Sequence, residues 1–171
     1  VDPKGTKLPD QPATLYAGTT AGIYKSSDGG ASWRAIGAGL PEIFGVKALL
    51  VDPHDSEIVF LGTGNHGLFR SVDGGENWTS VDAGDDTNYV GCLAAAPTTP
   101  TTLYMGTHDG LLVSADGGEK WRLLPSEGFA TVLAVAFDPQ APGKRLYVGS
   151  GNGVFKSTDG GKTWQEATSG L

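Results

Sequence analysis

The sequence predicts an all-β fold, a β-propeller built of four-stranded antiparallel blades, and three observations support this prediction. The pattern S-x-D-x-G-x-x-W occurs four times in the 171 residues, and its tryptophans are 43 to 45 residues apart. Each interval holds four short strand-like runs between turns rich in Gly, Asp and Pro. No segment has a sustained helical period. Four strands in about 43 residues match one propeller blade.

The expected strands recur in the same order in every repeat. Apolar runs that end in proline are predicted to be innermost strands, at 46–53, 90–97 and 132–139. Second strands are expected at 14–19, 58–63, 102–107 and 145–150, and third strands at 22–26, 67–71, 110–114 and 153–157. A short alternating stretch after each Trp is expected to be the fourth. The approximate blades are therefore 1–45, 46–89, 90–131 and 132–171, in a single propeller domain or propeller segment.

The given sequence begins and ends part-way through the pattern of repeats. Residues 1–3 match the end of a first strand, so the first blade is expected to lack most of its innermost strand. The sequence starts at Val without a signal peptide, and we interpret it as a mature or excised piece of an exported protein. Four such blades are expected to leave sheet edges and apolar faces open. Further blades of a longer chain, or a second copy, are therefore expected to close the ring.

The repeated pattern is predicted to be a structural turn between the third and fourth strands. Asp-Gly favours turns with positive φ, and the Asp carboxylate is expected to accept N–H bonds from two residues on, with the Ser hydroxyl adding another bond. The Trp supplies a large apolar area for packing on a neighbouring sheet. Four near-identical acids, one in each blade, lie too far apart for a single catalytic site. The structural set is Ser26, Asp28, Gly30, Trp33, Ser71, Asp73, Gly75, Trp78, Ser114, Asp116, Gly118, Trp121, Ser157, Asp159, Gly161 and Trp164.

The pattern S-x-D-x-G-x-x-W, together with "LYAGT" and "GVFKSTDGG", resembles the Asp-box or BNR repeat over nearly the whole chain. Propellers with this repeat include sialidases, xyloglucanases, the sortilin ectodomain and photosystem II assembly factors. The resemblance implies the fold, and it leaves the function open because these proteins do unrelated things.

Composition excludes several partners and cofactors. The net charge is −7 with 12 Lys and Arg, and no basic cluster exists, so neither nucleic acid nor an anionic membrane is an expected partner. No apolar run is long enough for membrane insertion. The single cysteine, Cys92, is expected in the core. His54, His66 and His108 show no metal-ligand spacing, so no metal and no cofactor are predicted.

Candidate ligand-binding residues lie on the turns that a four-strand meander places opposite the repeated patterns. These are the second-to-third turns and the loops between blades, and each of those loops offers an aromatic residue and an acid. Such a pairing suits sugars or extended peptides, although the rings could instead fill gaps between blades. The candidates are Phe44, Asn65, His66, Asp85, Asp86, Tyr89, His108, Asp109, Phe129 and Asn152.

Two functions are compatible with these features. The first is a non-catalytic scaffold that binds a protein, peptide or glycan through the loops opposite the boxes, with no catalytic residue. The alternative, implied by the resemblance, is a fragment of a glycoside hydrolase, xyloglucanase-like rather than sialidase-like. The Arg-Ile-Pro motif of sialidases is absent, and Arg34 and Arg122 are expected at the outer edge, away from the binding face. Acids for such a fragment would be Asp85 or Asp86 with Asp109 or Glu127.

Overall fold

The computed structural model describes residues 13–42, 45–84, 87–96, 98, 100–125, 128–138, 140–141 and 143–169. Within these residues the chain forms four antiparallel sheets, one of three strands and three of four, and no helix. The predicted fold class is confirmed. The three-stranded sheet is the first, and the residues expected to end its missing innermost strand, 1–3, lie outside the described part of the chain.

We call the sheets blades 1 to 4. Blade 1 contains β1 (Leu15–Thr19), β2 (Gly22–Ser26) and β3 (Arg34–Ile36). Blade 2 contains β4 (Val46–Val51), β5 (Val59–Thr63), β6 (Leu68–Ser71) and β7 (Thr79–Val81). Blade 3 contains β8 (Cys92–Ala96), β9 (Thr102–Gly106), β10 (Leu111–Ser114) and β11 (Arg122–Leu123). Blade 4 contains β12 (Val132–Phe137), β13 (Leu146–Ser150), β14 (Gly153–Ser157) and β15 (Gln165–Glu166).

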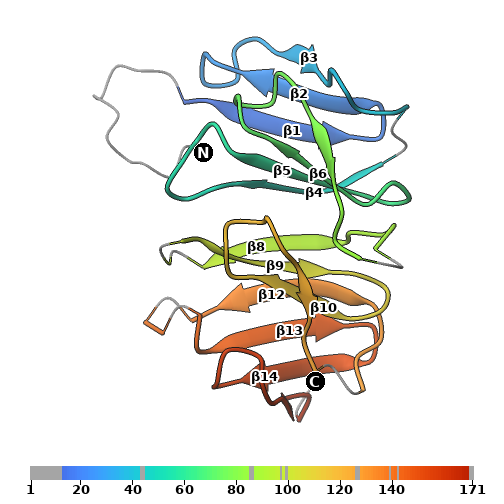
Figure 1. Ribbon diagram of the computed structural model, residues 1–171, viewed down its shortest axis with the longest axis vertical. Coiled ribbons are helices and arrows are strands. Elements are labelled where there is room, and N and C mark those ends of the chain that lie inside the picture. The colour runs from blue at the N-terminus through green and yellow to red at the C-terminus, as the bar shows by residue number, and fades with distance from the viewer. Residues whose placement is uncertain are drawn as a thin grey trace.

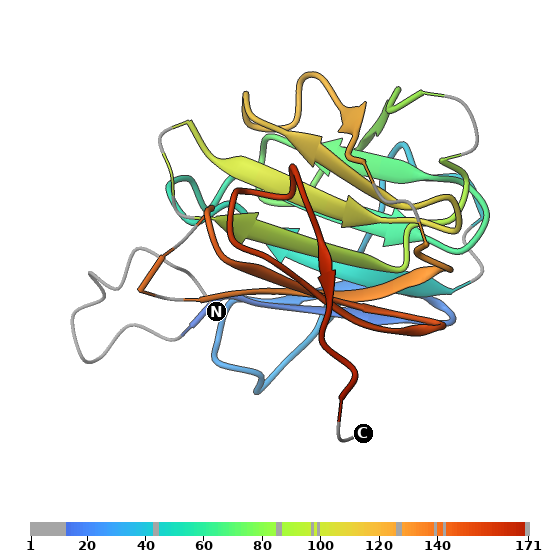
Figure 2. The same cartoon turned by 90° about the horizontal axis from the view of Figure 1, so that it is seen from below.

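Strands that follow one another in the sequence pair with each other, so every blade is a simple meander. The blades follow one another along the longest axis of the molecule, with blade 1 and blade 4 at opposite ends (Figure 1). Figure 2 shows the same sheets from below, with the orange and red strands of blade 4 in front. The innermost strands β4, β8 and β12 contact each other in sequence, and β1 contacts β4.

Each pair of neighbouring blades encloses its own hydrophobic core. Ile23 and Ile36 of blade 1 pack with Val59, Leu61 and Trp78 of blade 2. The two further cores lie between blades 2 and 3 and between blades 3 and 4. We call these contacts junctions 1–2, 2–3 and 3–4. Both faces of a middle blade are therefore apolar, which explains why its strands are near-continuous hydrophobic runs.

The Asp-box turns have the same internal bonding in all four blades. Ser Oγ donates to Asp Oδ1, at 2.7 Å in blade 2, and accepts the N–H of the second box glycine at 2.8 Å. Asp73 Oδ1 accepts the N–H of Asn77 at 2.9 Å, and the other three boxes repeat this bond. The main acceptor bond thus spans four residues, not the two that the sequence predicted. Two successive glycines with positive φ, Gly74 and Gly75 in blade 2, curl the chain far enough to bring the fourth residue back.

These bonds stabilise the charged form of the box acids. Hydrogen bonds from the backbone and side chain of Asn77 lower the pKa of Asp73 to about 2. Hydrogen bonds from the side chain and backbone of Thr163 likewise lower the pKa of Asp159 to about 2. A carboxyl group that accepts several N–H and O–H bonds loses them when it is protonated, so the boxes favour folding at neutral pH.

We predict that the box tryptophans contribute unequally to stability, because Trp78, Trp121 and Trp164 pack in the cores between blades whereas Trp33 does not. Trp78 is 3% exposed in junction 1–2, whereas Trp33 of blade 1 is 45% exposed. Trp78→Ala should lower the free energy of unfolding by about 3–5 kcal/mol, as expected for truncation of a large core residue. Trp33→Ala is the matched control and should cost much less. Urea unfolding measures both; equal losses would contradict this account.

We also predict that Asp73 makes stability depend on pH in the acid range. Its pKa is about 2 in the folded chain, below the value of about 3.9 for an unperturbed Asp. The stabilisation is therefore present above the unfolded pKa and is lost as the pH falls from about 5 toward 2. Asp73→Asn should lower the urea midpoint at pH 7, and its difference from the unsubstituted chain should shrink toward pH 2. A difference between the two chains that stays constant from pH 7 to pH 2 would contradict this account.

Candidate ligand-binding face

Backbone bonds assign the turns of each blade to two opposite ends. Gly74 of the second box donates its N–H to the carbonyl of Glu57, which lies in the turn between β4 and β5, at 2.8 Å. At the other end, Gly67 in the turn between β5 and β6 donates to Asn88 in the loop between blades, at 2.8 Å. The boxes therefore share one end with the first-to-second turns. We call the other end, with the second-to-third turns and the interblade loops, the opposite face.

An aromatic pair on the opposite face joins the loop before blade 3, which holds Tyr89, to the turn between β9 and β10, which holds His108. The rings of Tyr89 and His108 stack with their centroids 3.9 Å apart and their planes at 25°. His108 is exposed, and its Nδ1 lies 3.0 Å from Oγ1 of Thr131 in the next interblade loop. This hydrogen bond fixes the ring, so the pair offers a rigid, flat aromatic surface to solvent.

Asp109, the residue after His108, lines a cavity of about 320 Å³. The apolar walls are Ala83, Leu112, Leu123 and the indole of Trp121. Gly84 and four polar residues complete the lining: Thr87, Thr107, Asp109 and Arg122. An aromatic platform beside a few hydrogen-bonding groups is the usual composition of a small-ligand site.

The cavity exists because junction 2–3 is open where junction 1–2 is closed. In junction 1–2 the carbonyl of Ala38 accepts the N–H of Trp78 at 2.9 Å. A Cβ placed on Gly39 would lie 2.4 Å from the Trp78 carbonyl oxygen. The equivalent residue in blade 2 is Gly84, and a Cβ placed there would have no neighbour within 4 Å. Trp78 is consequently buried, whereas Trp121 is half-buried in the cavity wall.

Phe129 and Asn152 are engaged within junction 3–4. The Phe129 ring packs on Phe155 and Trp164, with centroid distances of 4.6 and 5.1 Å, and forms part of the core there. Asn152 accepts the N–H of Ala130 at 3.0 Å and donates to the Gly128 carbonyl at 2.5 Å, and so holds the loop in place. For Phe129 the structure favours the alternative that the ring fills a gap between blades.

The remaining candidates are distributed as follows. Asn65 and His66 are exposed in the turn between β5 and β6, one blade before His108. Although His66 and His108 occupy the same turn in successive blades, the ring of His108 stacks on Tyr89 and not on His66. Phe44, Asp85 and Asp86 lie outside the described residues.

The position of Arg122 corrects an expectation. We expected it at the outer edge, away from the binding face. It does lie on β11, the edge strand of blade 3, but it also lines the same cavity as Asp109. Trp121 and its apolar neighbours also line the cavity, although they were not among the residues predicted from the sequence. The box around Trp121 is the same as the others, so no local signal distinguishes this junction.

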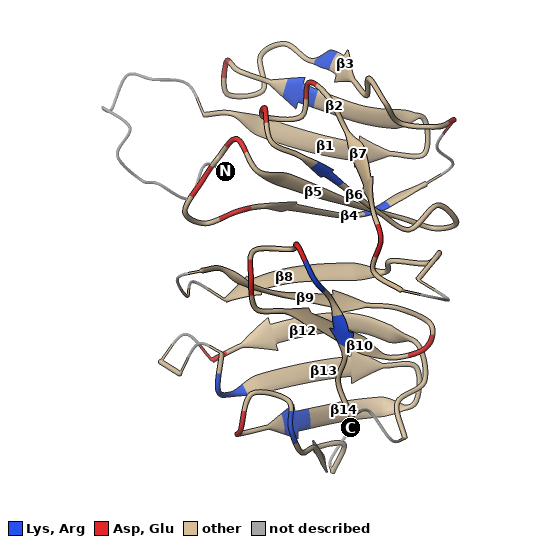
Figure 3. Ribbon diagram, in the orientation of Figure 1, with Lys and Arg blue, Asp and Glu red and all other residues tan. Residues whose placement is uncertain are grey.

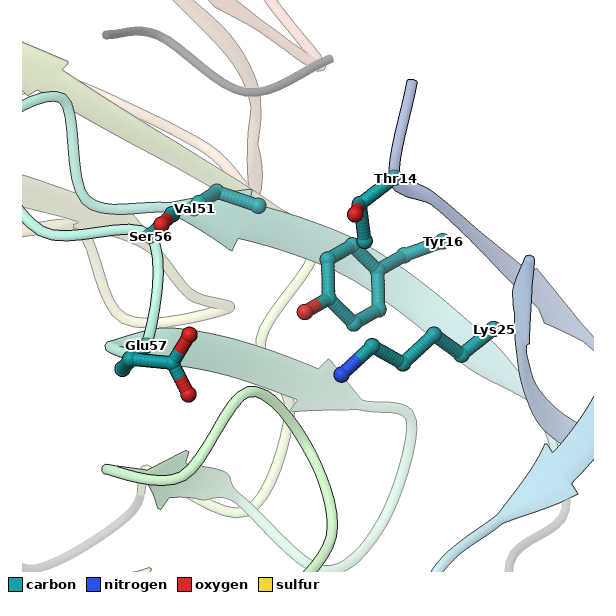
Figure 4. Close-up of a pocket in the computed structure, with 6 residues that line it drawn as sticks. All are labelled: Thr14, Tyr16, Lys25, Val51, Ser56 and Glu57. Carbon is teal, nitrogen blue, oxygen red and sulfur yellow. The ribbon is translucent and has the colours of Figure 1, made fainter. Parts of the chain in front are cut away.

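A second, smaller cavity of about 50 Å³ lies in junction 1–2 at the box end (Figure 4). Tyr16, Lys25 and Glu57 point into it. The Tyr16 hydroxyl and the Lys25 ammonium both donate to the Gly74 carbonyl, at 2.9 and 2.8 Å. This space suits a few water molecules, and we assign it to the contact between blades and not to a ligand site.

Two further observations concern the described residues as a whole. They contain no group of three or more His, Cys, Asp or Glu side chains arranged to hold a metal ion. They also contain no helix of the length and hydropathy needed to cross a membrane.

Repeated antiparallel blades, each with an Asp-box turn between its last two strands, define the chain as an Asp-box β-propeller protein. Family comparison agrees: residues 21–127 match the Sortilin-Vps10 family (sortilin, neurotensin receptor 3), and residues 155–166 match the BNR/Asp-box repeat. The chain therefore belongs to the Sortilin-Vps10 family. No curated protein shows significant similarity to the whole sequence.

Solved structures with a similar fold include three GH74 enzymes. An ancestral GH74 enzyme has a TM-score of 0.75 and 28% identity, over 94% of this chain and 23% of its own. The GH74 enzyme of Niastella koreensis has a TM-score of 0.73 and 26% identity, over 90% of this chain and 27% of its own. The GH74 xyloglucanase from Xanthomonas campestris has a TM-score of 0.72 and 25% identity, over 95% and 29%. The chain thus spans about a quarter of the length of these enzymes.

Proposed function

We propose that this chain is the glycan-binding part of an Asp-box β-propeller and that it binds a neutral polysaccharide on its opposite face. The observation that carries the proposal is that the Tyr89–His108 stack lies next along the chain to Asp109, which lines the cavity that contains Trp121. Sugar rings present C–H faces that pack on aromatic side chains, and their hydroxyl groups donate to carboxylates and hydroxyls.

Charge and similarity support a glycan over the other ligands considered. The net charge of −7 disfavours an acidic ligand, while a neutral sugar needs no cationic partner. The similar structures include a xyloglucanase, whose name makes xyloglucan the first glycan to test. Placement outside the cytoplasm is part of the same proposal.

We predict that His108 and His66 differ in their effect on glycan binding, although both are exposed and occupy the same turn in successive blades. His108→Ala removes one ring of the stack and its bond to Thr131, and should weaken binding of xyloglucan oligosaccharides about 5- to 10-fold. His66→Ala, the matched control, should leave the affinity within about twofold. Titration calorimetry measures both, and thermal unfolding verifies that each variant folds.

Two results would overturn the glycan proposal. One is an equal loss of affinity in both variants, and the other is an unsubstituted chain that binds no neutral glycan. If an extended peptide bound at Tyr89 in competition with the glycan, the ligand would be a peptide instead.

A second function, part of a glycoside hydrolase site, is favoured by the GH74 neighbours alone. Of the acids considered for it, Asp109 lies within the described residues, in the cavity wall. Release of reducing sugar from xyloglucan by the isolated chain, abolished by Asp109→Asn, would support this function. Glycan binding without such release would support the non-catalytic one.

A further inference from the structure

The strand β11 forms the outer edge of blade 3 and differs from the other outer edge strands of the described chain. Those edge strands are β3, β7 and β15. Of the four, β11 alone exposes a large apolar side chain, that of Leu123, which is 56% exposed. An open edge with apolar side chains can pair with another chain, and natural sheets usually avoid it. This edge is therefore a candidate for strand pairing with a partner.

The backbone of β11 presents hydrogen-bonding groups that the described part of the chain does not use. The N–H of Leu124 bonds to the carbonyl of Leu111 on β10, at 2.8 Å. Because alternate residues of an antiparallel strand direct their N–H and C=O groups to opposite sides, those of Leu123 point away from the sheet. The N–H of Trp121 has no acceptor among the residues that the structure describes. A partner strand would meet both groups.

Junction 1–2 shows how an extended segment occupies the same position in another blade. Ala38 forms a parallel bridge with Asn77, and its carbonyl accepts the N–H of Trp78 at 2.9 Å. Ala83 is the equivalent of Ala38 in blade 2, yet its carbonyl does not accept the N–H of Trp121. The position beside Trp121 is therefore open, and it borders the cavity of about 320 Å³.

A cavity lies on each face of this edge. Leu112 and Val113 are neighbours on β10, and Leu112 belongs to the core of junction 2–3 whereas Val113 belongs to that of junction 3–4. Leu112 and Leu123 line the cavity of about 320 Å³, and Val113 lines another of about 180 Å³. Trp121 and Arg122 line both. Side chains alternate along a strand, so consecutive side chains of an added strand would point toward one cavity and then the other.

The two cavities differ in chemistry. The first has apolar walls and suits an apolar side chain. The second is lined by Lys120 and Arg122, two basic positions on the segment that leads into β11 (Figure 3). Neither cation forms an ion pair with another described residue. Asp116 of the same lining already accepts the N–H groups of Glu119 and Lys120. A single carboxylate of a partner would thus meet two cations, although the whole chain is acidic.

We propose that β11 binds an extended peptide segment as an added strand, and that apolar and acidic side chains alternate in this segment. The apolar side chains pack over Leu123, and the acidic one pairs with Lys120 or Arg122. Main-chain hydrogen bonds to Trp121 and Leu123 supply affinity, while the two cavities supply the sequence preference. The peptide uses the edge of blade 3 and not the Tyr89–His108 stack, so its binding does not depend on that of a glycan.

A capped peptide of sequence TSLELST tests the proposal, because its Leu and Glu side chains fall on opposite faces of a strand. The control TLSESLT has the same composition but places Leu and Glu on one face. Titration followed by NMR should show that TSLELST binds about fivefold more tightly than TLSESLT. TSLQLST should bind about threefold more weakly than TSLELST, within the range of an exposed ion pair, and this difference should shrink at high salt.

Charge reversal makes the test specific to this edge. The unsubstituted chain should prefer TSLELST to TSLKLST, and Arg122→Glu should remove this preference. Arg34→Glu is the matched control, because Arg34 also follows a box Trp but pairs with Glu76 of the next box. It should keep the preference for TSLELST. Thermal unfolding verifies that both variants fold.

Hydrogen exchange reports on the added strand itself. The N–H groups of Trp121 and Leu123 should exchange more slowly when TSLELST is bound, whereas that of Leu124, already bonded to Leu111, should change little. Three results would overturn the proposal: no binding of TSLELST, equal binding of TSLELST and TLSESLT, or binding without slower exchange at Trp121 and Leu123. None of these measurements includes a glycan, so each of these results would leave the glycan proposal standing.

Discussion

The structure depends on the packing of each thin sheet against the next one. A sheet of three or four short strands buries too little surface to be stable alone. In blade 2, alternate residues of β5 serve both neighbours: Val59 and Leu61 face blade 1, and Phe60 faces blade 3. The stability of a blade is therefore a property of its two junctions, as in other repeat proteins whose units contact only their neighbours.

This dependence explains the form of the Asp-box. A turn that must fit against an aromatic ring of the preceding blade cannot carry side chains there, and glycine satisfies this requirement. The same glycines allow the positive φ values that wrap the turn around its Asp, which then bonds the chain four residues on. The box is thus a closed polar loop on the side that faces outward and a smooth surface on the side that faces the neighbouring blade. Its acids are consumed by these bonds and are not free for chemistry.

The opposite face is under weaker constraint. Its turns need only keep a few backbone bonds to the interblade loops, such as the bond from Gly67 to Asn88. The three junctions differ from one another at this end. One is closed by a backbone bond from Trp78 to Ala38, one is filled by Phe129, and one opens into a cavity. A rigid scaffold positions the binding residues, and the identity of those residues does not determine the scaffold.

Sequence alone determined the blades, the strands within about two residues at their ends, and the structural role of the box. For example, the expected strand 67–71 is β6, Leu68–Ser71. These features follow from local rules, namely alternation along a strand and the backbone preferences of Gly and Asp. Only the tertiary structure decided that Trp78 is buried while Trp33 is exposed, that Tyr89 stacks on His108, and that Trp121 lines a cavity. The physical reason is that these environments are set by residues on the neighbouring blade, whose contacts are not encoded in the repeat that contains the residue itself.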